Sequence, residues 1–315
     1  MTLPLTGQTV GFVGLGNMGA PMARHIAAAG ASVIVWNRTA SRAEAGVAAG
    51  MHRAMSLPQL AEAVGDGVIC INVTYTEVVE AIVFGKDGLQ SRNDLSGGDD
   101  LSGGDDLGKG LHDQAIVIDF GTTDVSATRR FAQRLNWVDA PVSGGQVGAR
   151  DATLSIMVGG SQQNFARALP ILQTVGKRIT HLGPSGAGQV TKLANQLIVA
   201  QTIDAVAQAL RLAELSGVDA NAARAAMLGG FADSRVLQLH GDRIARRDFV
   251  AGGRAALQLK DVRLICALAK EVGLASPTLD NSLSQWEKLV DQRGRGELDH
   301  SGLFTLYEES DSSVD

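Results

Sequence analysis

The sequence predicts an α/β domain built on a mostly parallel, doubly wound sheet, followed by an all-helical domain. In the first part of the chain, short β-rich runs alternate with helical stretches, as in parallel strands joined by crossover helices. A glycine-rich turn joins the first run to the first helical stretch. From about residue 186 the strand-like runs stop, and long Ala/Leu-rich segments with helix caps take over.

The composition is that of a globular protein long enough for two domains. The chain has 315 residues, of which 45% are apolar and 19% charged. A net charge of -5 and the lack of a Lys/Arg block argue against nucleic acid and acidic lipid as partners. The first residues lack a signal-peptide pattern, and no apolar run reaches roughly 18 residues. We expect a soluble, cytoplasmic protein that binds small molecules or copies of itself, with no nucleic acid and no membrane.

The expected strands are short and lie in the first half of the chain. They are the runs "TVGFVG", "ASVIVW", "GVICINV" and "AIVIDF", and the first helix is expected over residues 18 to 29. The junction "HLGPSGAG" predicts a first domain over 1–183 and a helical second domain over 184–315. In the second domain, Gly217 is expected just after a helix, Asp219 and Ser276 as N-caps, and Pro277 as a first helical residue.

No metal site is predicted. Cys70 and Cys266 lie in apolar runs that look buried, without C-x-x-C or Cys/His spacing, so neither a disulfide nor a metal centre is expected. The unit "LSGGDD" is repeated over residues 95–106, a composition that indicates a solvated loop. The alternative is a calcium site, but the spacing of its carboxylates is not that of an EF-hand; they are Asp99, Asp100, Asp105 and Asp106.

The glycine-rich turn predicts a dinucleotide site. A G-x-G-x-x-G follows the first expected strand and opens the first expected helix, so the glycines permit a tight turn and let the backbone approach a pyrophosphate. The amides and positive dipole end of the helix would face the phosphates. The alternative is a turn without a ligand. The residues concerned are Gly14, Leu15, Gly16, Asn17, Met18 and Gly19.

The end of the second strand favours NADP over NAD. Many NAD-binding folds place an acid there for the ribose hydroxyls, whereas this chain has Asn37, Arg38 and Thr39. Arg38 can pair with a 2'-phosphate, and the side chains of Asn37 and Thr39 can donate hydrogen bonds to it. NADP(H) is therefore the expected cofactor, with NAD(H) possible. The alternative for Arg38 is an ordinary solvated arginine.

Four motifs in order resemble the β-hydroxyacid dehydrogenases, a family that includes 3-hydroxyisobutyrate dehydrogenase and tartronate semialdehyde reductase. They are "FVGLGNMGAPMA", "DAPVSGG", "GAGQVTKLANQ" and "LKDVRLICALAKEVG". The resemblance spans the chain apart from the insert at 91–112. It implies an N-terminal Rossmann domain, a long interdomain helix that carries a catalytic lysine, and a helical C-terminal domain through which subunits pair as a homodimer or homotetramer.

Lys192 is the expected catalytic residue. It is the only Lys, Arg, Asp or Glu between Arg178 and Asp204. On a helix, Lys192, Asn195 and Gln196 stand at i, i+3 and i+4 and point toward one patch, which would be the interdomain cleft. Partial burial disfavours the ammonium form and prepares it to give a proton to a carbonyl oxygen as hydride arrives at carbon. The alternative is a lysine whose stem packs on the core while its head reaches solvent.

The resemblance also assigns the remaining site residues. Ser143 and the amides of Gly144 and Gly145 can form a small nest for the carboxylate of the substrate. Thr122 matches a residue near the nicotinamide ribose, and Lys260 matches a lysine that closes over the cofactor. After the "VICIN" strand the family usually carries a proline, where this chain has Asn72, Val73 and Thr74.

The substrate is expected to be a short 3-oxo acid. "KLANQ" and the C-terminal "DHSGL" resemble tartronate semialdehyde reductases more than 3-hydroxyisobutyrate dehydrogenases. NADPH-linked reduction of 2-hydroxy-3-oxopropionate to D-glycerate is therefore predicted. The alternatives are 3-hydroxyisobutyrate or another short β-hydroxy acid, an imine reductase, which typically has Asp or Tyr in place of the lysine, and a dinucleotide-binding module without activity.

Overall fold

The computed structural model describes residues 3–91 and 110–309. The chain forms two compact units, Met1–Lys192 and Leu193–Asp315. The repeated LSGGDD segment at 95–106, with its candidate calcium carboxylates, lies outside the described residues. The boundary expected between residues 183 and 184, which separates a dinucleotide-binding domain from a helical domain, stays a prediction.

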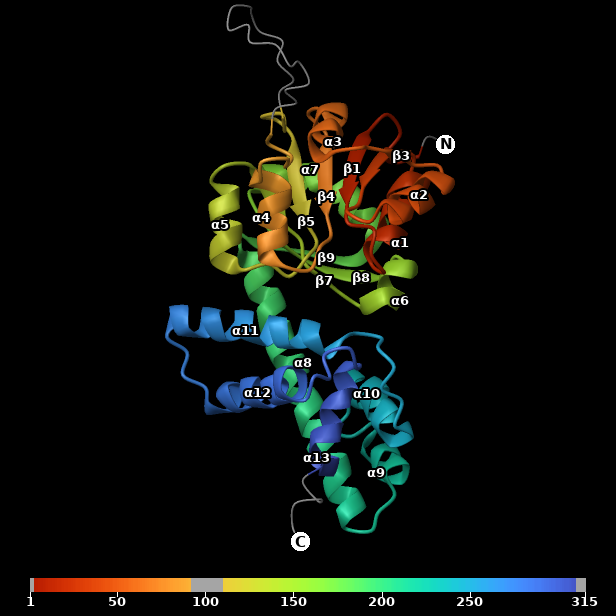
Figure 1. Ribbon diagram of the computed structural model, residues 1–315, viewed down its shortest axis with the longest axis vertical. Coiled ribbons are helices and arrows are strands. Elements are labelled where there is room, and N and C mark those ends of the chain that lie inside the picture. The colour runs from red at the N-terminus through yellow and green to blue at the C-terminus, as the bar shows by residue number, and fades with distance from the viewer. Residues whose placement is uncertain (1–2, 92–109, 310–315) are drawn as a thin grey trace, which may run out of the picture. The chain divides into compact units, whose positions relative to one another are not determined.

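The first unit is an α/β domain on a nine-stranded sheet (Figure 1). Six strands are parallel and run in the order β3-β2-β1-β4-β5-β6, which is the strand order of a Rossmann domain. This confirms the predicted fold class. The six are β1 (Thr9–Val13), β2 (Ser32–Trp36), β3 (His52–Arg53), β4 (Val68–Ile71), β5 (Ile116–Asp119) and β6 (Asn136–Asp139).

An antiparallel step extends the sheet beyond β6. Strand β8 (Leu154–Gly159) runs antiparallel to β6 and to the short β7 (Val142–Ser143), and it pairs in parallel with β9 (Gly176–Gly183). Strand β9 alternates partly buried and exposed positions, as expected for an edge strand with one solvated face. None of these three strands was predicted: β7 has only two residues and β9 alternates with polar positions, whereas the six-residue run of β8 is mainly apolar and was overlooked.

Helices cover both faces of the sheet. Successive residues of β5 alternate between two apolar clusters, so that Ile116 and Ile118 pack on one face and Val117 on the other. The first cluster includes side chains of α1 and α7, and the second includes those of α3, α4 and α5. The helices are α1 (Gly19–Ala28), α2 (Ala40–Ala48), α3 (Leu57–Val64), α4 (Thr76–Phe84), α5 (Val125–Ala132), α6 (Gly145–Arg150) and α7 (Gln162–Val175).

The second unit is helical, as predicted, and the described residues contain no strand after Gly183. Helix α8 (Ala187–Leu215) begins in the first unit and ends in the second. Its later turns pack through Val206 and Leu210 against Leu237, Ile244 and Phe304. The other elements are α9 (Ala220–Met227), α10 (Arg235–Arg246), α11 (Ala255–Val272), α12 (Pro277–Glu287), η1 (Lys288–Gln292), η2 (His300–Phe304) and α13 (Thr305–Glu309).

The predicted caps of the second unit are confirmed. Gly217 follows α8 with φ of +82°, a conformation that costs glycine little. The Asp219 carboxylate accepts a hydrogen bond from the amide of Ala222 at 2.9 Å and caps α9. Ser276 caps α12, whose first residue is Pro277. The side chains of Asp219 and Ser276 each satisfy a helix amide that would otherwise lack a partner.

In the part of the chain that the structure describes, the cysteines form neither a disulfide nor a metal centre. Both cysteines are free; Cys70 is buried as expected, whereas Cys266 on α11 is only partly buried, so this expectation was wrong for Cys266. Burial raises the pKa of both thiols, which keeps them in the unreactive protonated form. Over residues 3–91 and 110–309 there is no cluster of metal-ligating side chains, and no helix is long and apolar enough to cross a membrane.

Candidate active site

The glycine turn between β1 and α1 is closed by backbone contacts that exclude side chains. Gly14 has φ of +97°, and its amide donates to the Trp36 carbonyl at 3.1 Å. A Cβ on Gly14 would collide with the Asn72 carbonyl oxygen, and a Cβ on Gly19 would overlap the Gly14 carbonyl oxygen. Both positions therefore need glycine for the turn itself.

Gly16, the second glycine of the motif, has room for a side-chain carbon. The nearest atom to a Cβ built on Gly16 is the Arg42 guanidinium at 3.6 Å. Helix α1 starts after Met18 without a side-chain cap and has no acidic residue in its first turn. Within its first turn, the Ala20 amide already donates to the Gly16 carbonyl at 3.0 Å and Pro21 has no N–H, so an anion here would be bound by amides of the turn itself, with the positive end of the helix dipole in support. The residues present fit the pyrophosphate of a dinucleotide.

The end of β2 is tied to the glycine turn by Asn37. Its side-chain oxygen accepts from the Leu15 amide at 2.9 Å, and its side-chain nitrogen donates to the Thr39 carbonyl at 3.0 Å. The Asn37 amide therefore supports the turn, a role that the sequence analysis did not foresee. Arg38 and Thr39 are exposed, and Thr39 makes no side-chain cap hydrogen bond to α2. Their side chains can reach a group bound at this edge.

Residues 72 and 73 lie between the glycine turn and the loop after β5. The Asn72 amide donates to the Val13 carbonyl at 2.9 Å. The Val73 side chain approaches Gly14 from one side, and the Val73 carbonyl approaches Gly121 from the other. The structure thus brings these predicted residues to the carboxyl ends of β1, β4 and β5, where Rossmann domains bind their ligands. Thr74 follows them and is partly buried.

The loop that carries Thr122 is fixed on both sides. The Asp119 carboxylate accepts from the Gly121 amide at 2.9 Å and from the Thr123 hydroxyl at 2.6 Å. The Gln189 side chain accepts from the Thr123 amide at 3.1 Å and donates to the Gly121 carbonyl at 2.9 Å. Thr122, between them, is partly buried. Neither Asp119 nor Gln189 was among the predicted residues.

Lys192 is 7% exposed and stands near the start of α8. The start of this helix is fixed by the buried Asp139 carboxylate, which accepts from the amides of Gly186 at 2.8 Å and Gln189 at 3.0 Å. Burial raises the pKa of Asp139, and the hydrogen bonds from the helix amides oppose that shift. Asp139 opens the quoted motif "DAPVSGG", so its position in a motif was the signal that it matters.

The predicted carboxylate loop begins at the end of β7. Ser143 pairs with Ser155 of β8, and strand order places β8 between β7 and β6. Gly144 and Gly145 have φ of +131° and +62°, and both are exposed. Their backbone conformations favour glycine and turn the chain from β7 into α6.

In the second unit, the other predicted residues join a hydrogen-bonded group. The Asn195 side chain donates to the Gln196 oxygen at 2.9 Å, and the Gln196 nitrogen donates to the Asp261 carboxylate at 2.6 Å. Lys260 forms an ion pair with Asp261 at 2.9 Å. Asp261 thus connects two predicted residues, although the sequence analysis had not selected it. Buried Gln258 lies within 3.5 Å of the Gln196 nitrogen.

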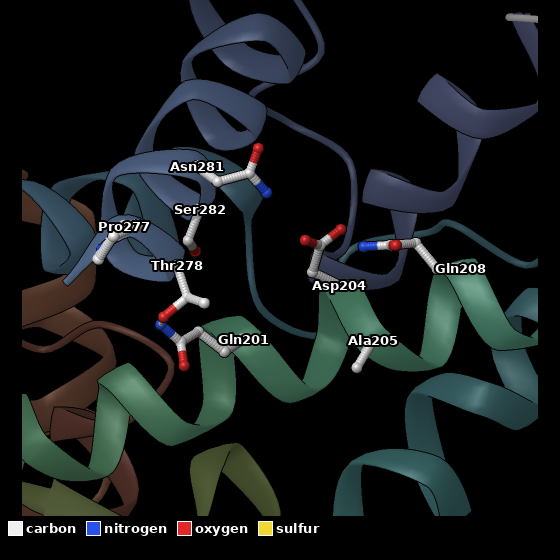
Figure 2. Close-up of a pocket in the computed structure, with 8 residues that line it drawn as sticks. All are labelled: Gln201, Asp204, Ala205, Gln208, Pro277, Thr278, Asn281 and Ser282. Carbon is white, nitrogen blue, oxygen red and sulfur yellow. Dashed lines mark hydrogen bonds between the residues drawn. The ribbon is translucent and has the colours of Figure 1, made fainter.

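A separate cavity of about 580 Å³ opens in the second unit between α8 and α12 (Figure 2). It contains none of the residues that the sequence predicted for catalysis. Asp204 lies on its α8 side and accepts a hydrogen bond from the Tyr307 hydroxyl, and the Gln201 side chain donates to the Thr278 hydroxyl at 3.4 Å. The lining is Gln201, Asp204, Ala205, Gln208, Pro277, Thr278, Asn281 and Ser282.

The comparisons with known proteins agree over both halves of the chain. A family model described as the NAD binding domain of 6-phosphogluconate dehydrogenase matches residues 9–183, and one described as NAD-binding of NADP-dependent 3-hydroxyisobutyrate dehydrogenase matches residues 186–307. A 2-hydroxy-3-oxopropionate reductase of Escherichia coli is 36% identical over 304 residues, covering 95% of this chain and 97% of the relative. The chain belongs to the β-hydroxyacid dehydrogenase family.

Two further relatives lie in the same family. A 3-hydroxyisobutyrate dehydrogenase of Pseudomonas aeruginosa is 31% identical, with 96% of this chain and 99% of that protein covered. The solved structure of a 3-hydroxyisobutyrate dehydrogenase of Mycobacterium tuberculosis superposes with a TM-score of 0.80 at 28% identity, over 95% of this chain and 98% of that one. This member of the β-hydroxyacid dehydrogenases is therefore an NAD(P)-binding oxidoreductase.

The two kinds of glycine in the turn should respond differently to alanine. Gly16→Ala should leave the melting temperature within about 2 °C of the wild type, because its Cβ makes only an ordinary contact with the Arg42 side chain. It should weaken dinucleotide binding at least about tenfold by blocking the pyrophosphate. Gly19→Ala should destabilise the protein by more than about 3 kcal/mol, because its Cβ overlaps backbone. Thermal unfolding and NADPH fluorescence titration test this pair. Equal melting losses in both variants would contradict the assignment.

Acid should destabilise the second unit through His300. Burial, followed by the neighbouring His240, lowers the pKa of His300 from its ordinary 6.5 to about 4, while Asp299 and Asp261 act in the opposite direction. The unfolded chain binds this proton near pH 6.5 and the folded chain only near 4, so stability falls as the pH is lowered through that window, by up to about 3 kcal/mol.

Urea unfolding at pH 7, 5.5 and 4.5 measures this effect. His300→Gln should lose less stability over that range than the wild type, whereas His52→Gln, at an exposed position on β3, should behave like the wild type. Identical acid sensitivity of the wild type and His300→Gln would show that another group is responsible.

Proposed function

We propose that this enzyme reduces 2-hydroxy-3-oxopropionate to D-glycerate with NADPH, with Lys192 as the general acid. The observation that carries the proposal is a lysine, 7% exposed, on a helix whose start is fixed at the carboxyl end of β6. Burial of an ammonium group disfavours its charged form, as a proton donor requires. The identity of 36% to a 2-hydroxy-3-oxopropionate reductase over nearly the whole chain supports the choice of substrate.

The chemistry requires a hydride, a proton and a fixed carbonyl group. NADPH, when bound, supplies the hydride to the aldehyde carbon. Lys192 gives its proton to the carbonyl oxygen as the carbon–oxygen double bond becomes a single bond, and its charge stabilises the developing alkoxide. In the reverse direction the neutral amine accepts the proton of the alcohol. Asn195, three residues further along α8, completes the proposed catalytic pair.

The remaining residues would bind and orient. Ser143, Gly144 and Gly145 donate hydrogen bonds to the substrate carboxylate, and Gln196 helps to position the substrate. Residues 14–19 hold the pyrophosphate at the amides of the turn. Asn72, Val73, Thr74 and Thr122 line the nicotinamide side, and Lys260 lies over the cofactor. The support is the placement of residues 72–73 beside the glycine turn and of Thr122 on the next loop.

Lys192→Ala tests the proposed acid. It should lower kcat for tartronate semialdehyde by about 100- to 10,000-fold, the usual contribution of a general acid, while NADPH binds within about threefold of wild type. NADPH oxidation at the nicotinamide absorbance and fluorescence titration give the two values. A variant that retains at least a third of the wild-type kcat would contradict the assignment.

The 3-hydroxyisobutyrate pair is the second candidate, since a 3-hydroxyisobutyrate dehydrogenase is 31% identical over 96% of the chain. Methylmalonate semialdehyde belongs in the same assay. A higher kcat/KM for methylmalonate semialdehyde than for tartronate semialdehyde would identify the former as the substrate. Lys192 would remain the proposed general acid. Binding of NADPH without turnover of either substrate would favour an imine reductase or a module without activity.

Arg38 should decide the preference for NADP. A charge-assisted pair with the 2'-phosphate is worth about 1.5–3 kcal/mol, so Arg38→Ala should raise the KM for NADPH about 10- to 100-fold and leave the KM for NADH nearly unchanged. Arg24→Ala removes the same charge from an exposed position on α1 and is the control. If Arg38→Ala raises the KM for NADPH and the KM for NADH by the same factor, Arg38 does not bind the 2'-phosphate.

We propose that the protein self-associates through α8, as a homodimer or a pair of dimers. Uncharged residues recur at intervals of three or four along one side of the helix: Ile198, Gln201, Ala205, Gln208, Leu212 and Leu215. Ile198, Leu212 and Leu215 are 68%, 68% and 62% exposed, and the cavity of Figure 2 lies beside this side of the helix. Since no charge interrupts the row, two copies can pair without like-charge repulsion.

Light scattering after gel filtration tests this association. The wild type should elute as a dimer or larger species, and Leu212→Glu should shift it toward the monomer at micromolar concentration, because pairing would then bury an unpaired carboxylate. Leu239→Glu on α10, also an exposed leucine, is the control and should not change the mass. A monomeric wild type would contradict the proposal.

A further inference from the structure

We infer that Gln189 is a positioning residue that binds the Thr122 loop to the start of the helix that carries Lys192. It would thereby fix the position of the proton donor relative to the loop proposed to line the nicotinamide. The inference rests on the proposed function of Lys192 as proton donor. In this inference Gln189 does not touch substrate or cofactor, but acts through its hydrogen bonds to the backbone of residues 121 and 123.

Both ends of the Gln189 side-chain amide are used inside the first unit. The side chain is 0% exposed, its oxygen accepts from the Thr123 amide at 3.1 Å, and its nitrogen donates to the Gly121 carbonyl at 2.9 Å. These two groups flank Thr122. Because a backbone N–H only donates and a carbonyl only accepts, the partners determine which end of the amide is oxygen.

The backbone of Gln189 is held as firmly as its side chain. Its amide donates to Asp139, at the end of β6, and the loop it binds is held by Asp119, at the end of β5. Asp119 and Asp139 stand opposite each other in the parallel register of these strands. The Gln189 side chain therefore connects the loop that leaves β5 to the helix start that the Asp139 carboxylate holds at the end of β6.

Lys192 follows Gln189 by three residues, so both lie on neighbouring parts of the same helix face. If the two hydrogen bonds from Gln189 to residues 121 and 123 are lost, the start of α8 is free to shift relative to Thr122. Displacements of about 1 Å cost about 100-fold in rate when two groups must meet a reacting atom together. Loss of the bridge should therefore lower kcat more than it lowers cofactor affinity.

Two substitutions separate this role from simple packing. Gln189→Met keeps the length of the side chain and removes both hydrogen bonds. In Gln189→Glu, the protonated acid reproduces both, because its carbonyl accepts from Thr123 and its hydroxyl donates to Gly121. The ionised carboxylate cannot donate, and the carboxylates of Asp119 and Asp139 in the same network disfavour it. The cations on the packed elements are Lys192, one turn further along α8, and Arg129 of α5, which approaches Gly186 at the start of α8.

The experiment compares kcat of each variant with the wild type from pH 5 to pH 9 at saturating NADPH, with NADPH affinity measured alongside. Gln189→Met should lie about 10- to 100-fold below wild type at every pH, with NADPH affinity within about threefold. Gln189→Glu should lie within about threefold of wild type at low pH and fall to the level of Gln189→Met as its acid ionises. Gln163→Met and Gln163→Glu, exposed on α7, are the matched controls and should follow the wild type.

Three results would overturn the inference: a kcat of Gln189→Met within twofold of wild type, a constant ratio of Gln189→Glu to wild type across the pH range, or equal losses of kcat and NADPH affinity. Hydrogen exchange of residues 119–124 tests the bridge without turnover, and unchanged protection in Gln189→Met would also overturn it. Full activity of Lys192→Ala contradicts the proposed function instead, whatever the Gln189 variants show.

Discussion

A buried carboxylate at the start of the longest helix determines where the candidate lysine stands. Asp139 is 0% exposed and accepts from two amides of the segment that opens α8. Two glycines leave room for it, since a Cβ on Gly159 would come within 2.6 Å of both its oxygens and one on Gly188 within 2.8 Å of Oδ2. An anion at the positive end of a helix dipole is stabilised, which offsets part of the cost of its burial. The helix start can therefore neither slide nor turn freely.

The arrangement of the dinucleotide half follows from the same edge of the sheet. Parallel strands bring their carboxyl ends together, so the glycine turn after β1, residues 72–73 after β4 and the Thr122 loop after β5 become neighbours although they are far apart in sequence. The glycine contacts show how close they are, because Gly14 and Gly121 both face the 72–73 backbone or side chain at distances that exclude a Cβ. A rigid support for a cofactor thus arises from backbone packing.

Local signals in the sequence were sufficient for much of this. The β-rich runs predicted β1, β2, β4 and β5, and the caps at Asp219 and Ser276 were found because a capping side chain bonds an amide two or three residues away. The glycine turn was found because the G-x-G-x-x-G spacing between a strand and a helix is a local pattern, although the atom that excludes a Cβ at Gly14 belongs to distant Asn72. The antiparallel edge was missed, since β7 has two residues and β9 alternates with polar positions.

Long-range hydrogen bonds left no such signal. Gln189 bonds partners 66 and 68 residues away, Asp139 bonds amides 47 and 50 residues away, and Gln196 bonds Asp261 at a separation of 65. Nothing adjacent to these residues marks them as partners, because the fold alone brings them together. Asn37 was expected to donate a hydrogen bond to a phosphate. In the structure its side-chain oxygen accepts a hydrogen bond from the Leu15 backbone amide. Lys192, Asp139 and Gln189 all stand in the quoted motifs, but a motif does not show which partners each of them bonds.

The central claim is that this enzyme delivers hydride from NADPH to the aldehyde carbon of a short 3-oxo acid. Mass spectrometry of glycerate formed from tartronate semialdehyde and NADPH deuterated at the transferring position of C4 measures that step directly. The account predicts glycerate with one deuterium at C3 and equimolar NADP+. Glycerate without deuterium, or no glycerate while NADPH is bound, would contradict it.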